Sequence, residues 1–166
     1  QQLAAAHIQF NGNITTTQQM NDGNAHAAQQ KQVLGTLYSP TLDSLVYWFM
    51  QKSINLYGES LIKTMAYKKT GSGSTKKGVE VLQDFWKQQG IEPAALNIMD
   101  GSGLSPQNRV TAAALVQALQ YAKNRNWFSA FKKALPVYNG MTMKSGTIGG
   151  AKAYAGYHTA KDGTGY

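Results

Sequence analysis

The sequence contains no cysteine, few charged residues and no long apolar run. The absence of cysteine excludes a disulfide framework, a thiolate nucleophile and a zinc site with cysteine ligands. The longest uninterrupted apolar run is Leu45–Met50, whereas a membrane-spanning helix needs about 20 apolar residues, so we expect no transmembrane segment. His7, His26 and His158 lack metal-ligand spacing and have no acidic cluster nearby, so we also expect no metal site.

Acidic residues are scarce as well. Eight Asp and Glu stand against 16 Lys and Arg, which gives a net charge of +8. This imbalance favours a polyanionic or carboxylate-ended partner, such as nucleic acid, an anionic cell wall or a peptide with a free C-terminus. Only two of the basic residues are arginine, the residue type that reads guanine edges and stacks on bases, so we expect no nucleic-acid partner. The length suits one domain with a sizeable core.

Five stretches have the apolar spacing of amphipathic helices. The first is expected to begin with Ser39 as N-cap and Pro40 as the first helical residue, and it continues to Met50. Glycines end the second and third stretches. The remaining expected helices are about residues 56–68, 77–89, 111–124 and a short one containing Trp127, Phe128 and Phe131.

The C-terminal part changes from helical to β character. Met141–Lys144 and Ala151–Ala160, separated by Gly149-Gly150, predict two antiparallel strands. Asp162-Gly163 is a second turn signal, so a third strand would begin at Tyr166, where the sequence stops. Because an open strand edge of this kind is unusual in a complete protein, we expect a fragment cut at both ends.

The N-terminal part is polar, and its apolar residues follow neither the spacing of a helix nor the alternation of a strand. We expect residues 1–37 to be the end of a preceding or inserted segment, with at most short strands at Ile8–Phe10 and Gln32–Leu37. Residues 38–166 would form the C-terminal part of the main domain.

Three short elements follow one another in a fixed order: Lys52-Ser53-Ile54-Asn55, Asp100-Gly101-Ser102-Gly103-Leu104-Ser105 and Lys144-Ser145-Gly146-Thr147. Ser-x-Asn between two helices directs a hydroxyl and an amide into a cleft, and Lys-Ser-Gly on a strand places a cation and a hydroxyl beside it. Taken singly, Ser53 is typical of a helix cap and Lys144 of a solvated edge strand.

Taken together, the three elements resemble those of the active-serine penicillin-binding proteins, most closely the class C low-molecular-mass group, the D-alanyl-D-alanine carboxypeptidase/endopeptidase family. The resemblance covers about residues 38–166. Its most specific part is Asp-Gly-Ser-Gly-Leu-Ser-x-x-Asn at Asp100–Asn108, because β-lactamases and other carboxypeptidases share the other two elements. It implies an α/β fold of the α+β type: the transpeptidase fold shared with serine β-lactamases, an antiparallel sheet with helices, here incomplete at both ends.

The resemblance also implies a serine acyl transfer, in which a Ser-x-x-Lys serine attacks the penultimate D-Ala carbonyl and water releases the acyl-enzyme. Ser53 would relay a proton to the leaving nitrogen and Lys144 would supply positive potential, which makes these two the expected catalytic residues. The expected substrate-binding residues are Asn55 for the substrate amide, Ser145 and Thr147 for the terminal carboxylate, and Gly146; the Thr147 N–H would complete the oxyanion hole.

The family usually has threonine at the position of Ser145, and either hydroxyl can donate a hydrogen bond. We expect Asp100–Asn108 to form a tight turn that caps the next helix, and we do not expect Ser102 or Ser105 to be catalytic.

The nucleophile is harder to place. Ser-x-x-Lys occurs at Ser60, Ser74 and Ser129, but with ten Ser and fourteen Lys chance alone accounts for about one such match. The family's nucleophile opens a helix well upstream of Ser-x-Asn, and none of the three has that context. Lys69-Thr70-Gly71 repeats the third element, but we expect it in a loop without a following strand. We therefore reject the three Ser-x-x-Lys matches and the Lys-Thr-Gly match. We expect the nucleophilic serine and its lysine to lie in sequence absent here.

The sequence thus predicts part of a serine-type D-Ala-D-Ala carboxypeptidase/endopeptidase of the periplasm or extracytoplasmic cell envelope. Its expected partners are peptidoglycan stem peptides, β-lactam inhibitors and the missing N-terminal part of the same protein, and it needs no cofactor. The alternative is a non-catalytic cell-wall-binding relative of the same fold. A basic nucleic-acid-binding domain is a distant third.

Overall fold

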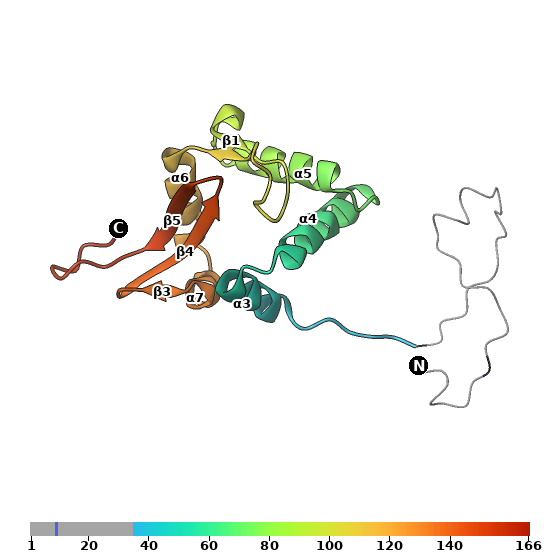
Figure 1. Ribbon diagram of the computed structural model, residues 1–166, viewed down its shortest axis with the longest axis horizontal. Coiled ribbons are helices and arrows are strands. Elements are labelled where there is room, and N and C mark those ends of the chain that lie inside the picture. The colour runs from blue at the N-terminus through green and yellow to red at the C-terminus, as the bar shows by residue number, and fades with distance from the viewer. Residues whose placement is uncertain (1–8, 10–34) are drawn as a thin grey trace. The chain divides into compact units, whose positions relative to one another are not determined.

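The computed structural model describes residue 9 and residues 35–166, and the compact unit Ser39–Tyr166 holds every helix and strand described (Figure 1). The strands expected at Ile8–Phe10 and Gln32–Leu37 lie outside the described residues, except Gln9 and residues 35–37, which are in no strand. The elements are α3 (Leu42–Lys52), α4 (Asn55–Thr70), α5 (Thr75–Gln88), a 3-10 turn (Pro93–Ala95), β1 (Leu96–Asn97), β2 (Arg109–Val110), α6 (Ala112–Lys123), α7 (Phe128–Ala134), β3 (Val137–Tyr138), β4 (Met141–Ile148) and β5 (Ala151–Tyr157).

Helix α3 begins two residues later than the sequence suggests. Thr41 is the N-cap, since its Oγ1 accepts the Ser44 N–H at 3.4 Å, and the two hydroxyls lie 3.0 Å apart. The expected capping by Ser39 is wrong, because the Ser39 hydroxyl instead donates to the Pro40 carbonyl at 3.1 Å. Ser and Thr are both favoured N-caps. With Thr41 as the N-cap, Asp43 lies in the first turn of α3, where its negative charge interacts favourably with the helix dipole.

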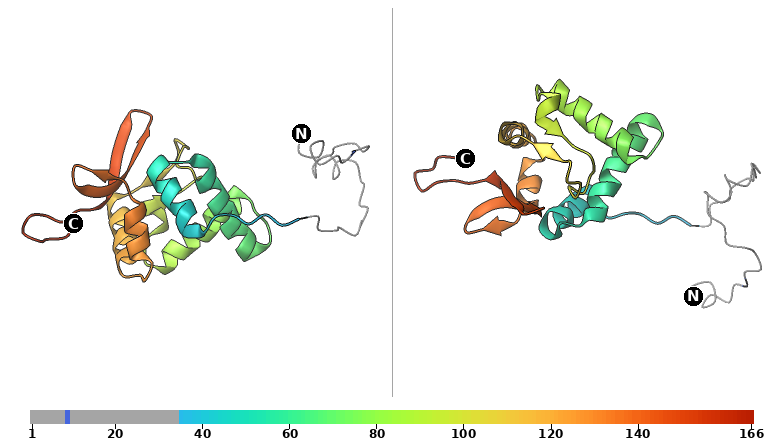
Figure 2. Two further views of the ribbon diagram at one scale, coloured as in Figure 1. Left: turned by 90° about the horizontal axis from the view of Figure 1, so that it is seen from below. Right: turned by 45° about the horizontal axis from the view of Figure 1, so that its top comes forward.

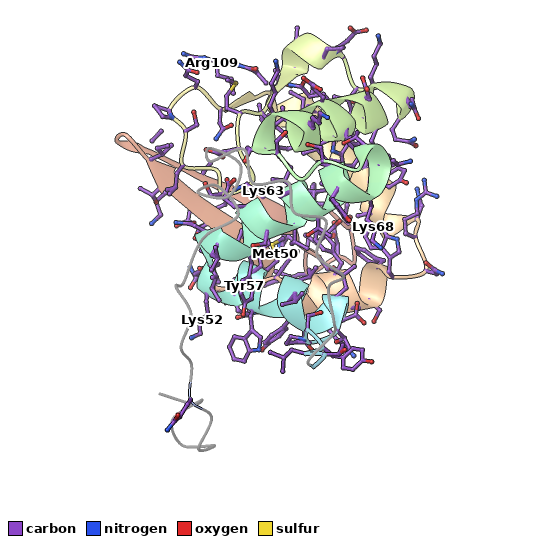
Figure 3. The ribbon with its side chains drawn as sticks, turned by 90° about the vertical axis from the view of Figure 1, so that its right-hand side faces the viewer. Met50, Lys52, Tyr57, Lys63, Lys68 and Arg109 are labelled. Atoms are coloured by element: carbon purple, nitrogen blue, oxygen red, sulfur yellow. The ribbon has the colours of Figure 1, made fainter. Side chains whose placement is uncertain are left out.

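Helices α4 and α5 are joined by a short loop and pack against each other. Gly71 ends α4 in the left-handed conformation (φ 73°), and the Ser74 side chain caps α5 by accepting the Lys77 N–H at 3.2 Å. Buried Gly78 allows the two helices to approach closely, because an added methyl group would collide with the Ile62 carbonyl. Figure 3 looks onto this side of the molecule, where Tyr57, Lys63 and Lys68 mark the course of α4.

The small apolar core lies between α5, the β1–β2 ribbon and α6. Its buried members are Ile91, Leu96 and Ala114, with Trp86 packed against them. Helix α6 is capped by Thr111, whose Oγ1 accepts the Ala114 N–H at 3.2 Å, so the predicted helix over residues 111–124 is confirmed. The two-residue pairing of β1 with β2 was not predicted, because strands this short carry no periodicity.

A three-stranded antiparallel sheet has the order β3-β4-β5. Gly149 and Gly150, with φ values of 52° and 82°, make the predicted turn between β4 and β5. Strand β4 continues to Ile148, beyond the predicted end at Lys144, and the short β3 was not predicted. The backbones of Tyr166 and His158 exchange hydrogen bonds of 2.9 and 2.7 Å, so the chain does turn back toward β5 as expected.

Tyr157 of β5 joins the sheet to α6 and α7. Its hydroxyl donates to the Leu119 carbonyl at 2.8 Å, and its ring meets Phe128 edge to face, with centroids 5.0 Å apart. The views of Figure 2 show the β4–β5 hairpin at the side of the helices.

The interior is smaller than the length suggests. Only eight apolar residues of the described part are buried, and four of these are alanine. Helix α3 buries none of its residues, and Trp48 is 48% exposed. The expected sizeable core is therefore not found, because α3 and the sheet each leave apolar side chains uncovered by the described residues. No helix in residues 35–166 is long and apolar enough to cross a bilayer.

Candidate active site

Ser53 occupies a sharp bend between two helices. It follows the last residue of α3 and has left-handed backbone angles (φ 52°, ψ 48°), which turn the chain directly into α4 at Asn55. The N-cap of α4 is Ile54, without a side-chain hydrogen bond, whereas Ser53 is the C-cap of α3, so the reading of Ser53 as a helix cap is confirmed for the end of α3. Within residues 35–166 the Ser53 hydroxyl has no hydrogen-bond partner. A non-glycine residue in this conformation is strained by about 1–3 kcal/mol, and such strain is concentrated at functional sites.

Lys144 and Ser145 lie in strand β4, opposite Ala155 and Tyr154 of β5. The Lys144 ammonium donates to the Ser145 carbonyl at 2.6 Å. The Ser145 and Tyr138 hydroxyls lie 3.4 Å apart. Among the described residues, β3 pairs with β4 only at Met141 and Thr142, so the edge of β4 from Lys144 onward is open on the side away from β5.

A cavity of about 480 Å³ brings the first and third sequence elements together. Its wall includes Ser53 from the bend after α3 and Lys144, Ser145 and Gly146 from β4, together with residues of α3, α4, α5, β2 and the loop between β1 and β2. Figure 1 shows α4 and β4 on either side of this loop. Asn55 and Thr147 are not on the wall. The structure thus gathers four of the six predicted site residues and leaves two outside.

The loop that follows β1 is organised by one carboxylate. Asp100 accepts the backbone N–H groups of Gly103 and Ser105, both at 2.7 Å, and the Asn108 side-chain amide at 3.1 Å. The predicted tight turn is confirmed, but its expected capping of the next helix is wrong, because Thr111 caps α6. Asp100 and Asn108 also line the cavity, so this phrase contributes to the wall as well as to the turn.

A second carboxylate fastens the same loop to the helices. Glu59 of α4 accepts the N–H groups of Gly101 and Ser102 on one oxygen, at 2.9 and 3.0 Å, and the Thr75 hydroxyl on the other at 3.2 Å. Sequence reasoning missed Glu59. Its partners are mainly backbone N–H groups, which every residue but proline carries, so no pattern in a single sequence could have identified it.

The rejected Ser-x-x-Lys matches occupy three different settings. Ser60 is exposed on α4, and Ser74 is engaged as the cap of α5. Ser129 and Lys132 of α7 line a second cavity of about 500 Å³, whose wall includes neither Ser53 nor Lys144. Lys69-Thr70-Gly71 is in no strand, as expected, but its expected place in a loop is wrong, because Lys69 and Thr70 form the last turn of α4 and Gly71 caps it.

Residues 35–166 contain no cluster of three His, Asp or Glu side chains that could hold a metal ion. Within the same residues, no buried side-chain nitrogen or oxygen lacks a hydrogen-bond partner. The polar side chains that line the cavity are serine hydroxyls, the Asn108 amide, the Lys144 ammonium and the Asp100 carboxylate, which already accepts hydrogen bonds from the loop. The hydroxyls and the ammonium are donors that can bind a substrate carboxylate.

The fold defined by these elements is that of a penicillin-binding protein. The crystal structure of penicillin binding protein 4 (dacB) from Haemophilus influenzae superimposes with a TM-score of 0.85 at 24% identity, over 99% of this chain and 39% of that one. The same protein complexed with a β-lactam gives a TM-score of 0.83 at 25% identity, over 99% and 40% of the two chains. The predicted fold class is confirmed.

The family model of the D-Ala-D-Ala carboxypeptidase 3 (S13) family matches residues 1–164, and this chain belongs to that family. It is 29% identical over 156 residues to the D-alanyl-D-alanine carboxypeptidase of Actinomadura sp. (strain R39), covering 81% of this chain and 29% of that protein. It is 32% identical over 129 residues to DacB of Haemophilus influenzae (strain ATCC 51907 / DSM 11121 / KW20 / Rd), covering 75% and 25%. The resemblance seen in the sequence is confirmed, and the match also includes residues 1–37.

The chain spans about a quarter to two fifths of the length of these relatives.

Proposed function

We propose that this chain is part of a serine-type D-Ala-D-Ala carboxypeptidase/endopeptidase that cleaves peptidoglycan stem peptides through an acyl-enzyme and is acylated by β-lactams. The observation that carries the proposal is the shared cavity of Ser53, Lys144 and Ser145, which come from a helix bend and a strand that are distant in the sequence. Family membership supports the reaction type, and the β-lactam complex of the H. influenzae protein supports the inhibitor class. A peptidoglycan substrate requires a periplasmic or other extracytoplasmic site of action.

In this proposal the nucleophile is the serine of a Ser-x-x-Lys element outside these 166 residues. Its oxygen bonds to the penultimate D-Ala carbonyl carbon, and the C–N bond to the terminal D-Ala then breaks. The leaving nitrogen takes a proton relayed by the Ser53 hydroxyl, whose position at the cavity and lack of another partner among residues 35–166 suit that role. Water then hydrolyses the acyl-enzyme and regenerates the serine.

The strand supplies the electrostatic part of the site. Lys144 provides positive potential, and the Ser145 and Thr147 hydroxyls bind the substrate carboxylate, although Thr147 does not line the cavity. The open edge of β4 leaves backbone groups available to an extended peptide, including the Thr147 N–H proposed for the oxyanion hole. Asn55 also lies outside the cavity wall. In this proposal it would hold the amide of a longer substrate at the rim of the cavity.

For the organisation of the chain, we propose that residues 38–166 form part of the transpeptidase-like domain and that residues 1–37 belong to a preceding or inserted segment. Limited proteolysis of the protein tests this division, since cleavage between the two parts should leave residues 38–166 resistant.

The proposed function is tested on the full-length protein with a fluorescent penicillin and a stem pentapeptide. We expect one covalent penicillin per molecule, attached to a Ser-x-x-Lys serine outside residues 1–166, and release of free D-Ala from the peptide. Mass spectrometry of tryptic fragments identifies the acylated serine. Reversible binding of peptidoglycan without acylation or D-Ala release would favour the non-catalytic cell-wall-binding alternative.

A further inference from the structure

The Glu59 carboxylate joins three elements around the candidate site. Through one oxygen it holds the Gly101 and Ser102 N–H groups, at 2.9 and 3.0 Å, and through the other it holds the Thr75 hydroxyl at 3.2 Å. Glu59 lies in α4, Gly101 and Ser102 lie in the cavity loop, and Thr75 begins α5. Glu59 itself does not line the cavity, whereas Gly101 and Ser102 do.

A close backbone contact accompanies these hydrogen bonds. Gly58, next to Glu59, is buried, and a methyl group at Gly58 or at Gly101 would collide with the carbonyl oxygen of the other. Helix α4 and the cavity loop therefore touch at a point where neither has a side chain. The contact limits how closely the loop can approach α4, and the Glu59 hydrogen bonds hold the loop against the helix at this point.

We propose that Glu59 is a positioning residue, which acts through the Gly101 and Ser102 backbone to hold the cavity wall in the shape that binds the acylating ligand. This inference rests on the proposed function, because acylation is its readout. One Glu59 oxygen accepts the N–H groups of two consecutive residues, so a single side chain can hold both backbone positions of this loop. A loop with Gly101 and Gly103 has little stiffness of its own.

Substitutions at position 59 can distinguish the effect of the three hydrogen bonds from the effect of the carboxylate charge. A glutamine at position 59 can accept both N–H groups on its amide oxygen and donate its NH₂ to the Thr75 hydroxyl oxygen, so it can reproduce every contact. An alanine can reproduce none. Glu80 of α5 is an exposed acid outside the cavity and is the matched control.

The experiment measures the kinetics and the final stoichiometry of fluorescent-penicillin acylation in the full-length protein and its variants. We expect Glu59→Ala to lower the second-order acylation rate about tenfold with unchanged final stoichiometry, since misplaced binding groups slow reaction without removing the nucleophile. Glu59→Gln should stay close to the parent rate, and Glu80→Ala should match it. Amide hydrogen exchange at Gly101 and Ser102 should accelerate in Glu59→Ala alone.

The alternatives give different results. A purely structural role would lower the fraction of molecules that are ever acylated while the remainder react at the parent rate, and that result would overturn the inference. Parent-like kinetics in Glu59→Ala, or a Glu59→Gln variant as slow as Glu59→Ala, would overturn it as well. Failure of the parent protein itself to be acylated would instead overturn the proposed function, and this inference with it.

Discussion

Ser53 and Lys144 line the same cavity, although Ser53 closes helix α3 and Lys144 lies in strand β4, with four further helices between them in the chain. The Ser53 hydroxyl has no partner within residues 35–166, and the Lys144 ammonium is held by the Ser145 carbonyl. A hydroxyl that can relay a proton thus shares a cavity with a fixed positive charge, as the proposed acyl transfer requires.

Replacement of Lys144 tests the electrostatic role of the strand. In the full-length protein we expect Lys144→Ala to lower the penicillin acylation rate by about 100-fold or more, on the scale of losing one preorganised electrostatic donor. Lys144→Gln should be equally slow, because the mechanism uses the charge and not the length of the side chain. Lys161→Ala removes an exposed lysine elsewhere and should leave the rate unchanged. A Lys144→Ala variant with the parent rate would contradict the assignment.

Replacement of Ser53 separates activity from stability. Ser53→Gly should leave the free energy of unfolding unchanged or raise it by up to about 1 kcal/mol, because glycine adopts φ 52° without strain. Both Ser53→Gly and Ser53→Ala should slow acylation by about 100-fold or more if the hydroxyl relays a proton. Urea denaturation and stopped-flow acylation measure the two effects. An active Ser53→Gly variant would exclude the relay.

The chain of 166 residues by itself should neither hydrolyse D-Ala-D-Ala peptides nor form a stable adduct with penicillin. Positive potential and carboxylate-binding groups cannot open a β-lactam without a nucleophile to acylate. Incubation with fluorescent penicillin followed by mass spectrometry checks this. Acylation of Ser60, Ser74 or Ser129 would show that one of the rejected matches is functional, and Ser129 is the most informative because it shares a cavity with Lys132.

The Tyr157 hydroxyl should stabilise the contact between β5 and α6. Loss of its hydrogen bond to the Leu119 carbonyl in Tyr157→Phe should lower the free energy of unfolding by about 1 kcal/mol at neutral pH. Tyr67→Phe, at a residue that is 60% exposed, is the control and should have little effect. Thermal unfolding of the two variants measures the difference.

The same residue predicts a pH dependence. Burial raises the pKa of Tyr157 above its ordinary value of 10.0, so the folded protein keeps this proton when the unfolded chain has lost it. The contribution of this pKa difference to the free energy of unfolding is fully present below pH 10. It is lost as the pH rises from there through the folded-state pKa. Tyr157→Phe should therefore lose less stability than the parent between pH 9 and pH 11, measured by urea denaturation.

The close contact between α4 and the cavity loop predicts a destabilising glycine replacement. Alanine is favoured over glycine in a helix by about 1 kcal/mol, yet Gly58→Ala places a methyl group against the Gly101 carbonyl. Because overpacking typically costs about 1–3 kcal/mol, we expect a net decrease in the free energy of unfolding. Ser60→Ala, at an exposed position of the same helix, should be neutral or slightly stabilising. A more stable Gly58→Ala variant would show that the loop can move away.

The sequence by itself determined the local elements of this protein. Apolar spacing predicted α4, α5 and α6, and the Gly149-Gly150 pair predicted the hairpin, because helices and tight turns depend on neighbours within a few residues. The order of the Ser53, Asp100 and Lys144 elements was sufficient to indicate the family. Sequence could not choose between Ser39 and Thr41 as the first N-cap, since both side chains suit that place.

Only the tertiary structure decided what meets at the cavity. It placed Ser53 and Lys144 on the wall of one cavity and left Asn55 and Thr147 off it, because the packing of α4, the loop and β4 controls that arrangement and no local pattern encodes it. It also showed the role of Glu59, whose backbone partners in the loop have no sequence signature. Contacts between residues far apart in the chain depend on the whole arrangement of packed elements, whereas helix caps and turns depend on a few adjacent side chains.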